Sequence, residues 1–322
     1  MKTEDRGTVK RMICSDCEQY LLQLEGQPYR EYRMNWNHSG AALEQHDHPL
    51  QLNIELTSYC NLRCKMCNYN FIENKTHKHL SLELVDQIVN EAKSLHVESL
   101  WLGAYSEGLL HPDIIEILRK FAQVKSLDYW LLTNGTLLNK RVAETIVDIP
   151  LTWLTVSLDA ATAETYKQIR GGRLDIVERN IDEFLKIREE KGSKLPFLRV
   201  SFVDMKENHN ELELFRKKWE GKADIVDVQT LMDFSENAVN APIDGSFVCR
   251  DLYRMLSIKY DGELLPCCSA AYESAGKNFY LKDVSIQQFW NSNFHKALLE
   301  SVRSKKYLPH CMRCVRCFRP MH

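Results

Sequence analysis

The sequence predicts an α/β protein, a partial (β/α)6 TIM-like barrel followed by a small cysteine-rich extension. Two observations predict this fold. Strand-like and helix-like runs alternate from residue 52 to residue 229, and the alternation stops in the C-terminal third. Repeated β–α units give parallel strands joined by right-handed crossovers, and six such units form a curved, partly open barrel. We expect an N-terminal extension over residues 1–50, a core over 51–235 and a C-terminal domain over 236–322.

Length and composition limit the classes of function. The chain has 322 residues, is 44% hydrophobic and carries a net charge of −2, which gives no electrostatic case for binding nucleic acid or a membrane surface. No apolar run approaches the roughly 20 residues of a membrane span, and the N-terminus lacks the apolar segment of a signal peptide. Eleven cysteines in such a chain indicate a cytoplasmic protein with metal or redox chemistry instead of a disulfide framework.

Residues 1–50 are polar and aperiodic apart from a short helix-like piece over residues 18–24. Cys14 and Cys17 form an isolated C-x-x-C pair, for which His46 and His48 are the nearest candidate partners in a zinc site. The alternative is a reduced surface extension that covers one end of the domain.

The core is predicted from six strand-like and six helix-like runs. The strand-like runs are residues 52–57, 99–103, 128–133, 152–158, 197–203 and, more weakly, 223–229. The helix-like runs between them are residues 81–95, 113–124, 140–147, 161–169, 174–190 and 208–219. Ser81, Pro112-Asp113 and Asn139 mark three of the helix starts.

A C-x-x-x-C-x-x-C motif, formed by Cys60, Cys64 and Cys67, follows the first strand. Three thiolates at this spacing can converge on a soft metal centre, either an iron–sulfur cluster or zinc. Three is one fewer than either site usually takes, so a [4Fe–4S] cluster here would keep one iron open to a small molecule. The motif lies at the carboxyl end of a strand, where (β/α) barrels place their ligands.

A strand followed by this motif resembles the radical S-adenosylmethionine (SAM) enzymes. The resemblance implies a [4Fe–4S] cluster on Cys60, Cys64 and Cys67, whose fourth iron chelates SAM. It also implies one-electron cleavage of SAM to methionine and a 5′-deoxyadenosyl radical that removes hydrogen from an unactivated C–H bond. Met66 stands where the family usually has an aromatic residue near the adenine, and methionine can pack on a ring.

Residues after the later strands extend this resemblance. Ser106 and Glu107 lie where the family often has G-G-E-P, and the glutamate with its adjacent backbone holds the amino group of SAM. Asn134 belongs to a turn that resembles the family's T-N-G motif, which implies a mainly architectural role. Ser157, in a segment similar to the family's S-I/L-D-G, is implied to lie near SAM. Asn208 is implied to approach its ribose or carboxylate.

The C-terminal third combines cysteines with a predicted hairpin at Asp261-Gly262 and helices over residues 284–291 and 294–302. This order resembles the SPASM/twitch extension of radical SAM enzymes, and the short tail is closer to the twitch form with one auxiliary [4Fe–4S] cluster. The resemblance implies four ligands, with Cys317 able to replace one of the last two: Cys249, Cys267, Cys311 and Cys314. A zinc ribbon on the same cysteines is the alternative.

These features predict a radical SAM oxidoreductase or epimerase that acts on a sugar, aminosugar or polyol, with a flavodoxin or ferredoxin as electron donor. Transfer of an electron to the auxiliary cluster would give dehydrogenation. Hydrogen return from a thiol, Cys268 or Cys317, would give epimerisation, although a cysteine is also simply a small apolar side chain. The alternatives are a radical SAM peptide maturase and a zinc-bound structural or interaction protein.

Overall fold

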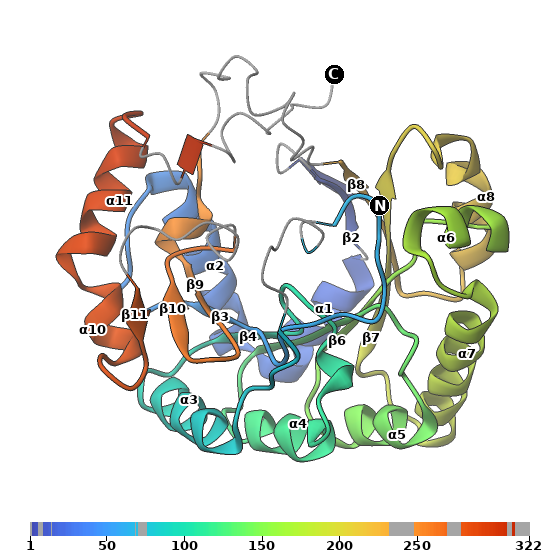
Figure 1. Cartoon of the computed structure of the whole chain (residues 1–322), viewed down its shortest axis with the longest axis horizontal. Coiled ribbons are helices and arrows are strands. Elements are labelled where there is room, and N and C mark those ends of the chain that lie inside the picture. The colour runs from blue at the N-terminus through green and yellow to red at the C-terminus, as the bar shows by residue number, and fades with distance from the viewer. Residues whose placement is uncertain are drawn as a thin grey trace.

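The computed structural model describes residues 2–5, 9–13, 15–67, 69, 76–231, 248–268, 278–307 and 311–312. In this part of the chain one curved sheet forms the centre of the molecule (Figure 1). Six of its strands are parallel neighbours in sequence order, which confirms the predicted barrel core. They are β3 (Gln51–Ile54), β4 (Ser99–Leu102), β5 (Asp128–Thr133), β6 (Trp153–Ser157), β7 (Phe197–Asp204) and β8 (Ile225–Thr230).

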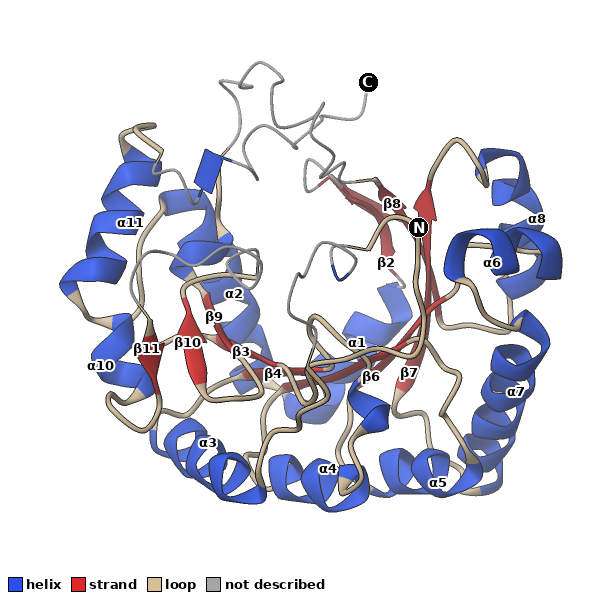
Figure 2. Cartoon of the chain, viewed as in Figure 1, coloured by secondary structure: helices blue, strands red, loops and turns tan. Residues whose placement is uncertain are grey.

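The helices between these strands cover the outer face of the sheet (Figure 2). They are α3 (Leu82–Ser94), α4 (Ile114–Ala122), α5 (Lys140–Asp148), α6 (Ala163–Arg170), α7 (Leu174–Glu190) and α8 (Leu212–Trp219). Two predicted starts are confirmed, because Ser81 Oγ accepts a hydrogen bond from Leu84 N (3.2 Å) and Asn139 Oδ1 accepts one from Val142 N (3.1 Å). Asp113 makes no such side-chain cap at the start of α4.

The sheet continues beyond the six strands at both edges. β9 (Met255–Ile258) runs parallel beside β3, although the two strands are far apart in the sequence. β10 (Glu263–Leu265) then turns back antiparallel, which confirms the hairpin predicted at Asp261-Gly262, and β11 (Phe279–Tyr280) pairs with it. At the other edge β2 (Val9–Ile13) pairs antiparallel with β8, and β1 (Lys2–Asp5) with β2. The C-terminal helices are α10 (Ile286–Trp290) and α11 (Asn293–Arg303).

The helix-like piece expected over residues 18–24 is confirmed, but the expectation that the residues after it are aperiodic is wrong. Residues 15–42 form two helices, α1 (Ser15–Glu25) and α2 (Gln27–Ala42), which cover the amino ends of the barrel strands. Their apolar side chains form one buried cluster with residues at or near the amino ends of the strands: Cys17, Leu21, Tyr29, Tyr32 and Trp36 with Trp130, Trp153, Phe197, Ile225 and Met255. The extension therefore does cover one end of the domain. Cys17 packs in this apolar cluster, and Cys14 lies outside the described residues.

The two faces of the barrel sheet differ in polarity. Side chains alternate along each strand, and the outward-facing set, such as Leu52, Leu154 and Val200, belongs to the core beneath the helices. The inward-facing set includes buried polar residues that lie on neighbouring strands: Asn53, Thr155, Arg199, Ser201, Asp227 and Ser257. The inner face of the sheet is thus partly polar, and α1 and α2 pack against its amino end. No helix in the described part of the chain is long and apolar enough to cross a membrane.

Candidate metal and cofactor site

The loop over residues 60–67 follows β3, so its three cysteines lie at the carboxyl end of the barrel. All three side chains are buried or half-buried. Each sulfur accepts an N–H hydrogen bond: Cys60 from Leu62 N (3.4 Å), Cys64 from Arg170 Nη1 (3.6 Å) and Cys67 from Tyr69 N (3.4 Å). Donors arranged in this way stabilise thiolates, the form in which cysteine binds metal.

Burial dominates the acid–base behaviour of these thiols. It raises the pKa of Cys60 to about 12 and also raises the pKa values of Cys64 and Cys67. Binding all three as thiolates therefore releases protons. No three His, Cys, Asp or Glu side chains in the described residues are grouped as they would be around a single metal ion.

Neighbouring strand ends hold the cysteine loop in place. Lys65 N donates to Ile169 O at the end of α6 (2.8 Å). Asn134, just past β5, donates from Nδ2 to Asn61 Oδ1 (2.8 Å) and lies 3.8 Å from Cys60 Sγ by the same atom. The Oδ1 atom of Asn134 accepts from Thr136 N (2.9 Å). Asn134 therefore shapes its own turn and also contacts the cysteine loop.

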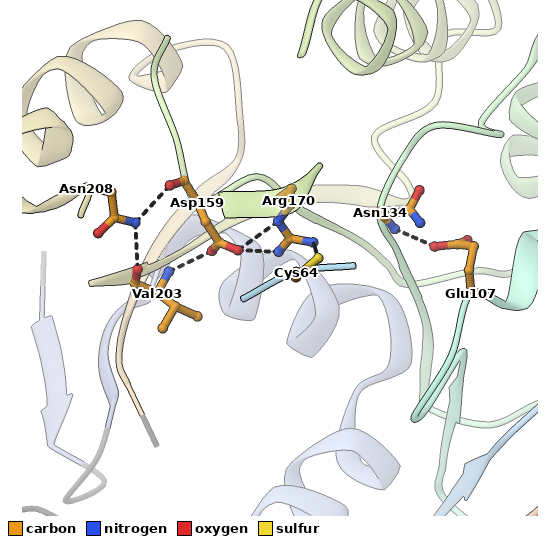
Figure 3. A network of polar contacts seen from close by, with 7 residues as sticks. All are labelled: Cys64, Glu107, Asn134, Asp159, Arg170, Val203 and Asn208. Atoms are coloured by element: carbon orange, nitrogen blue, oxygen red, sulfur yellow. Dashed lines mark hydrogen bonds and ion pairs between the residues drawn. The ribbon is translucent and has the colours of Figure 1, made fainter. Parts of the chain in front are cut away.

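Glu107 lies in the loop after β4 and is 2% exposed. Its Oε1 accepts from Thr133 Oγ1 (2.7 Å) and Leu109 N (3.2 Å), and its Oε2 accepts from Asn134 N (2.7 Å; Figure 3). Burial raises the pKa of Glu107, and these three hydrogen bonds act in the opposite direction. The carboxylate thus joins the ends of β4 and β5 beside the cysteine loop. Its contact with SAM stays a prediction.

Three other predicted cofactor contacts also lie at this end of the barrel. Ser157 is half-buried at the end of β6, and Met66 is half-buried within the cysteine loop. The Ser106 hydroxyl donates to the backbone oxygen of Thr57, just past β3. The structure therefore brings the residues that follow β3, β4, β5 and β6 to the carboxyl end of the barrel, as the motifs predict.

A buried polar network completes this end of the barrel (Figure 3). Asp159 follows β6 in the left-handed conformation (φ 59°), and its Oδ1 accepts from Val203 N (2.7 Å). Its Oδ2 accepts from Arg170 Nε (2.8 Å) and Nη2. Asn208 Nδ2 donates to the backbone oxygens of Asp159 and Val203, both at 2.8 Å.

This network includes Asn208, a predicted cofactor contact, and Arg170, which the sequence motifs do not predict as a site residue. Both amide hydrogens of the fully buried Asn208 side chain bind backbone oxygens, so Asn208 braces this end of the barrel, and its approach to SAM stays a prediction. Burial lowers the pKa of Arg170, but the facing Asp159 carboxylate and Cys64 more than compensate, so its pKa is raised and the side chain stays charged.

The C-terminal cysteines form a second group. Cys249, Cys267 and Cys311 pack in or against one small apolar cluster that also contains Tyr253 and Leu265. Three of the four predicted auxiliary ligands therefore contact the same apolar cluster. Cys268 is exposed, so its role as a hydrogen donor stays a prediction. Cys314 and Cys317 lie outside the described residues.

Two family models and several known proteins match this chain. Residues 54–194 match the radical SAM superfamily, and residues 249–315 match SPASM, an iron–sulfur cluster-binding domain. The chain is 28% identical to the tungsten-containing aldehyde ferredoxin oxidoreductase cofactor-modifying protein of Pyrococcus furiosus, over 72% of this chain and 61% of that protein. A probable GTP 3′,8-cyclase of Methanococcus aeolicus is 26% identical, over 67% of this chain and 84% of the cyclase.

A solved structure shows the same fold. Streptococcus suis SuiB bound to its precursor peptide SuiA superposes with a TM-score of 0.61 at 17% identity, covering 85% of this chain and 71% of SuiB. The chain spans less than two thirds of the Pyrococcus protein. The two matched domains imply a [4Fe–4S] cluster, SAM and an auxiliary cluster.

Proposed function

This chain belongs to the radical SAM superfamily and carries a SPASM region, and from that premise we propose that it removes hydrogen from an unactivated C–H bond of a sugar, aminosugar or polyol. The proposed outcome is dehydrogenation or epimerisation. When bound, the cluster supplies the electron that cleaves SAM into methionine and the hydrogen-abstracting 5′-deoxyadenosyl group. Cys60, Cys64 and Cys67 would hold the cluster, and Glu107 and Ser157 would orient SAM beside it.

Buried polar residues on the inner face of the barrel sheet are the observation that favours a polar, hydroxyl-rich substrate. Thr155, Arg199 and Asp227 are each no more than 5% exposed and face the interior from β6, β7 and β8. Arg199 pairs with Asp227, yet Thr155 Oγ1, Arg199 Nε and Asp227 Oδ1 have no hydrogen-bond partner in the described part of the chain. Leaving such a buried atom unpaired costs about 1–3 kcal/mol. A substrate rich in hydroxyl or amino groups offers the donors and acceptors that this inner face lacks.

The C-terminal cysteines bear on the outcome. Cys249, Cys267, Cys311 and Cys314 would hold an auxiliary cluster, which would accept the electron of a substrate radical that has lost a proton and so give an oxidised product. A hydrogen atom from the thiol of Cys268 or Cys317 would instead give an epimer and leave a thiyl radical on that cysteine, which one electron from the proposed electron donor and one proton would return to the thiol. The exposed position of Cys268 favours the first outcome among these two.

A peptide maturase is the second candidate, favoured by the likeness to SuiB bound to its precursor peptide. That likeness concerns the fold, and one fold supports many substrates. The polar inner face of the sheet and the relation to a GTP cyclase, whose named substrate contains a ribose, favour the small polar molecule. A flavodoxin or ferredoxin is the proposed electron donor.

Isotope transfer distinguishes the two candidates. The reconstituted protein is incubated with SAM, a reductant and either fully C-deuterated inositols, hexosamines and nucleosides or deuterated short peptides of mixed sequence. We expect substrate-dependent formation of deuterated 5′-deoxyadenosine with a member of the first panel, detected by mass spectrometry. Deuterium transfer from the peptide panel alone would contradict the proposed substrate class.

A further inference from the structure

The three cysteine sulfurs of the loop do not have equivalent hydrogen-bond donors. Cys60 and Cys67 accept from the neutral backbone N–H groups of Leu62 and Tyr69, and Cys60 also accepts from the neutral side-chain amide of Asn134. Cys64 accepts from the charged guanidinium of Arg170, a residue that is only 7% exposed. A cation held against one metal-binding sulfur in a buried site changes the electrostatic energy of whatever charge resides there.

The position of this guanidinium is fixed from two sides. Asp159 is fully buried and receives Arg170 Nε and Nη2, which leaves Nη1 directed at the Cys64 sulfur (Figure 3). Val203 N in turn fixes the other carboxylate oxygen of Asp159. Arg170 is also the last residue of α6, and the hydrogen bond from Lys65 N to Ile169 O ties that end of the helix to the cysteine loop.

We propose that Arg170 is a positioning residue that raises the reduction potential of the cluster bound through Cys64, and that Asp159 sets the size of this effect. The inference rests on the proposed cluster at Cys60, Cys64 and Cys67. One-electron reduction adds a negative charge and no proton. The Arg170 cation and its N–H···S bond therefore stabilise the reduced cluster more than the oxidised one. The neighbouring Asp159 carboxylate acts in the opposite direction.

The test compares reduction potentials of reconstituted protein before SAM is added, by a redox titration followed by electron paramagnetic resonance. The signal that changes when SAM is added afterwards identifies the cluster with the open iron. We expect Arg170→Gln to lower the potential and Asp159→Asn, which keeps an oxygen for Val203 N, to raise it. The expected size is at least tenfold in the reduction equilibrium, about 59 mV for one electron.

Arg173→Gln is the matched control, because Arg173 lies three residues beyond Arg170, is 70% exposed and pairs with Asp175. Its potential should equal that of the parent. Arg170→Lys keeps the charge but cannot hydrogen-bond to Asp159 and Cys64 as the guanidinium does. Its reduction potential should therefore lie between those of Arg170→Gln and the parent. A shift of the same sign in Arg170→Gln and Asp159→Asn, or none relative to Arg173→Gln, overturns the inference. Absence of any iron–sulfur cluster from the parent protein contradicts the proposed function instead.

Discussion

Replacing Glu107 by glutamine tests most sharply how the residues after β4 and β5 are arranged around the predicted SAM site. The substitution keeps the shape of the side chain and exchanges one carboxylate oxygen for an NH2 group. The groups facing the carboxylate, Thr133 Oγ1, Leu109 N and Asn134 N, all donate to it. The new NH2 group therefore meets a donor in either orientation.

The size of the effect follows from these contacts. If the NH2 group faces Asn134, one hydrogen bond of 2.7 Å is lost, and if it faces Thr133 and Leu109, two are lost. A hydrogen bond to a charged group contributes about 1.5–3 kcal/mol, and the site is buried. We therefore expect the free energy of unfolding to fall by about 2–4 kcal/mol, measured by urea denaturation of the metal-free, reduced protein with an unchanged m-value.

SAM binding provides the second measurement. Glu107 is predicted to hold the amino group of SAM, so Glu107→Gln should weaken SAM binding to reconstituted protein at least tenfold in equilibrium dialysis. Glu211→Gln is the matched control, because Glu211 also accepts several hydrogen bonds, from Ala161 N (2.7 Å) and Thr165 Oγ1 (2.6 Å) among others, at the start of α6. It should lose comparable stability and bind SAM normally. The prediction is wrong if the free energy of unfolding of Glu107→Gln lies within about 0.5 kcal/mol of the parent value and the variant also binds SAM normally.

Other predictions concern the fold around the site, and urea denaturation of the metal-free protein measures each. Leu21→Ala should lower the free energy of unfolding by about 2–5 kcal/mol, because Leu21 is 1% exposed beneath the barrel. A negligible decrease would show that α1 lies on the surface instead. Gly135→Ala should cost about 2–4 kcal/mol, since an added Cβ would lie 2.7 Å from Val177 and 2.9 Å from Val156 at a φ of 76°; an unchanged stability would show that the turn differs. Burial raises the pKa of Glu55 from 4.5 to about 8, so the folded protein retains a proton that the unfolded chain releases between those values. The stability that this proton gives is complete below about pH 4.5 and lost by about pH 8. Between these values the free energy of unfolding of the parent should fall relative to that of Glu55→Gln by up to about 1.4 kcal/mol per pH unit. Parallel pH profiles of the two proteins would contradict the shift.

Local patterns were sufficient to predict the barrel core. Each of the six strands and helices has its own apolar periodicity, and parallel strands follow from their alternation. The pairing of β9 with β3 could not be read in this way, because it joins segments about 200 residues apart through backbone hydrogen bonds. The helix α2 was missed because its buried aromatic residues, Tyr29, Tyr32 and Trp36, are separated by mostly polar positions. Their spacing of three and four residues was the available signal.

The candidate site divides in a similar way. Residues in recognisable motifs at strand ends, such as Cys60, Glu107 and Asn134, could be found in the sequence because the barrel topology collects those ends. Arg170 could not, since its function depends on the turn that brings the end of α6 against the cysteine loop and on the left-handed backbone of Asp159. An arginine at the end of a helix is otherwise an ordinary surface residue.

The central claim is that this chain holds two iron–sulfur clusters, one of them on Cys60, Cys64 and Cys67. Iron and sulfide content after anaerobic reconstitution tests it directly, for the parent and for a variant in which these three cysteines are replaced by alanine. We expect about eight iron atoms per parent chain and about four in the variant, because each cubane contains four. Little iron with stoichiometric zinc in both proteins would contradict it.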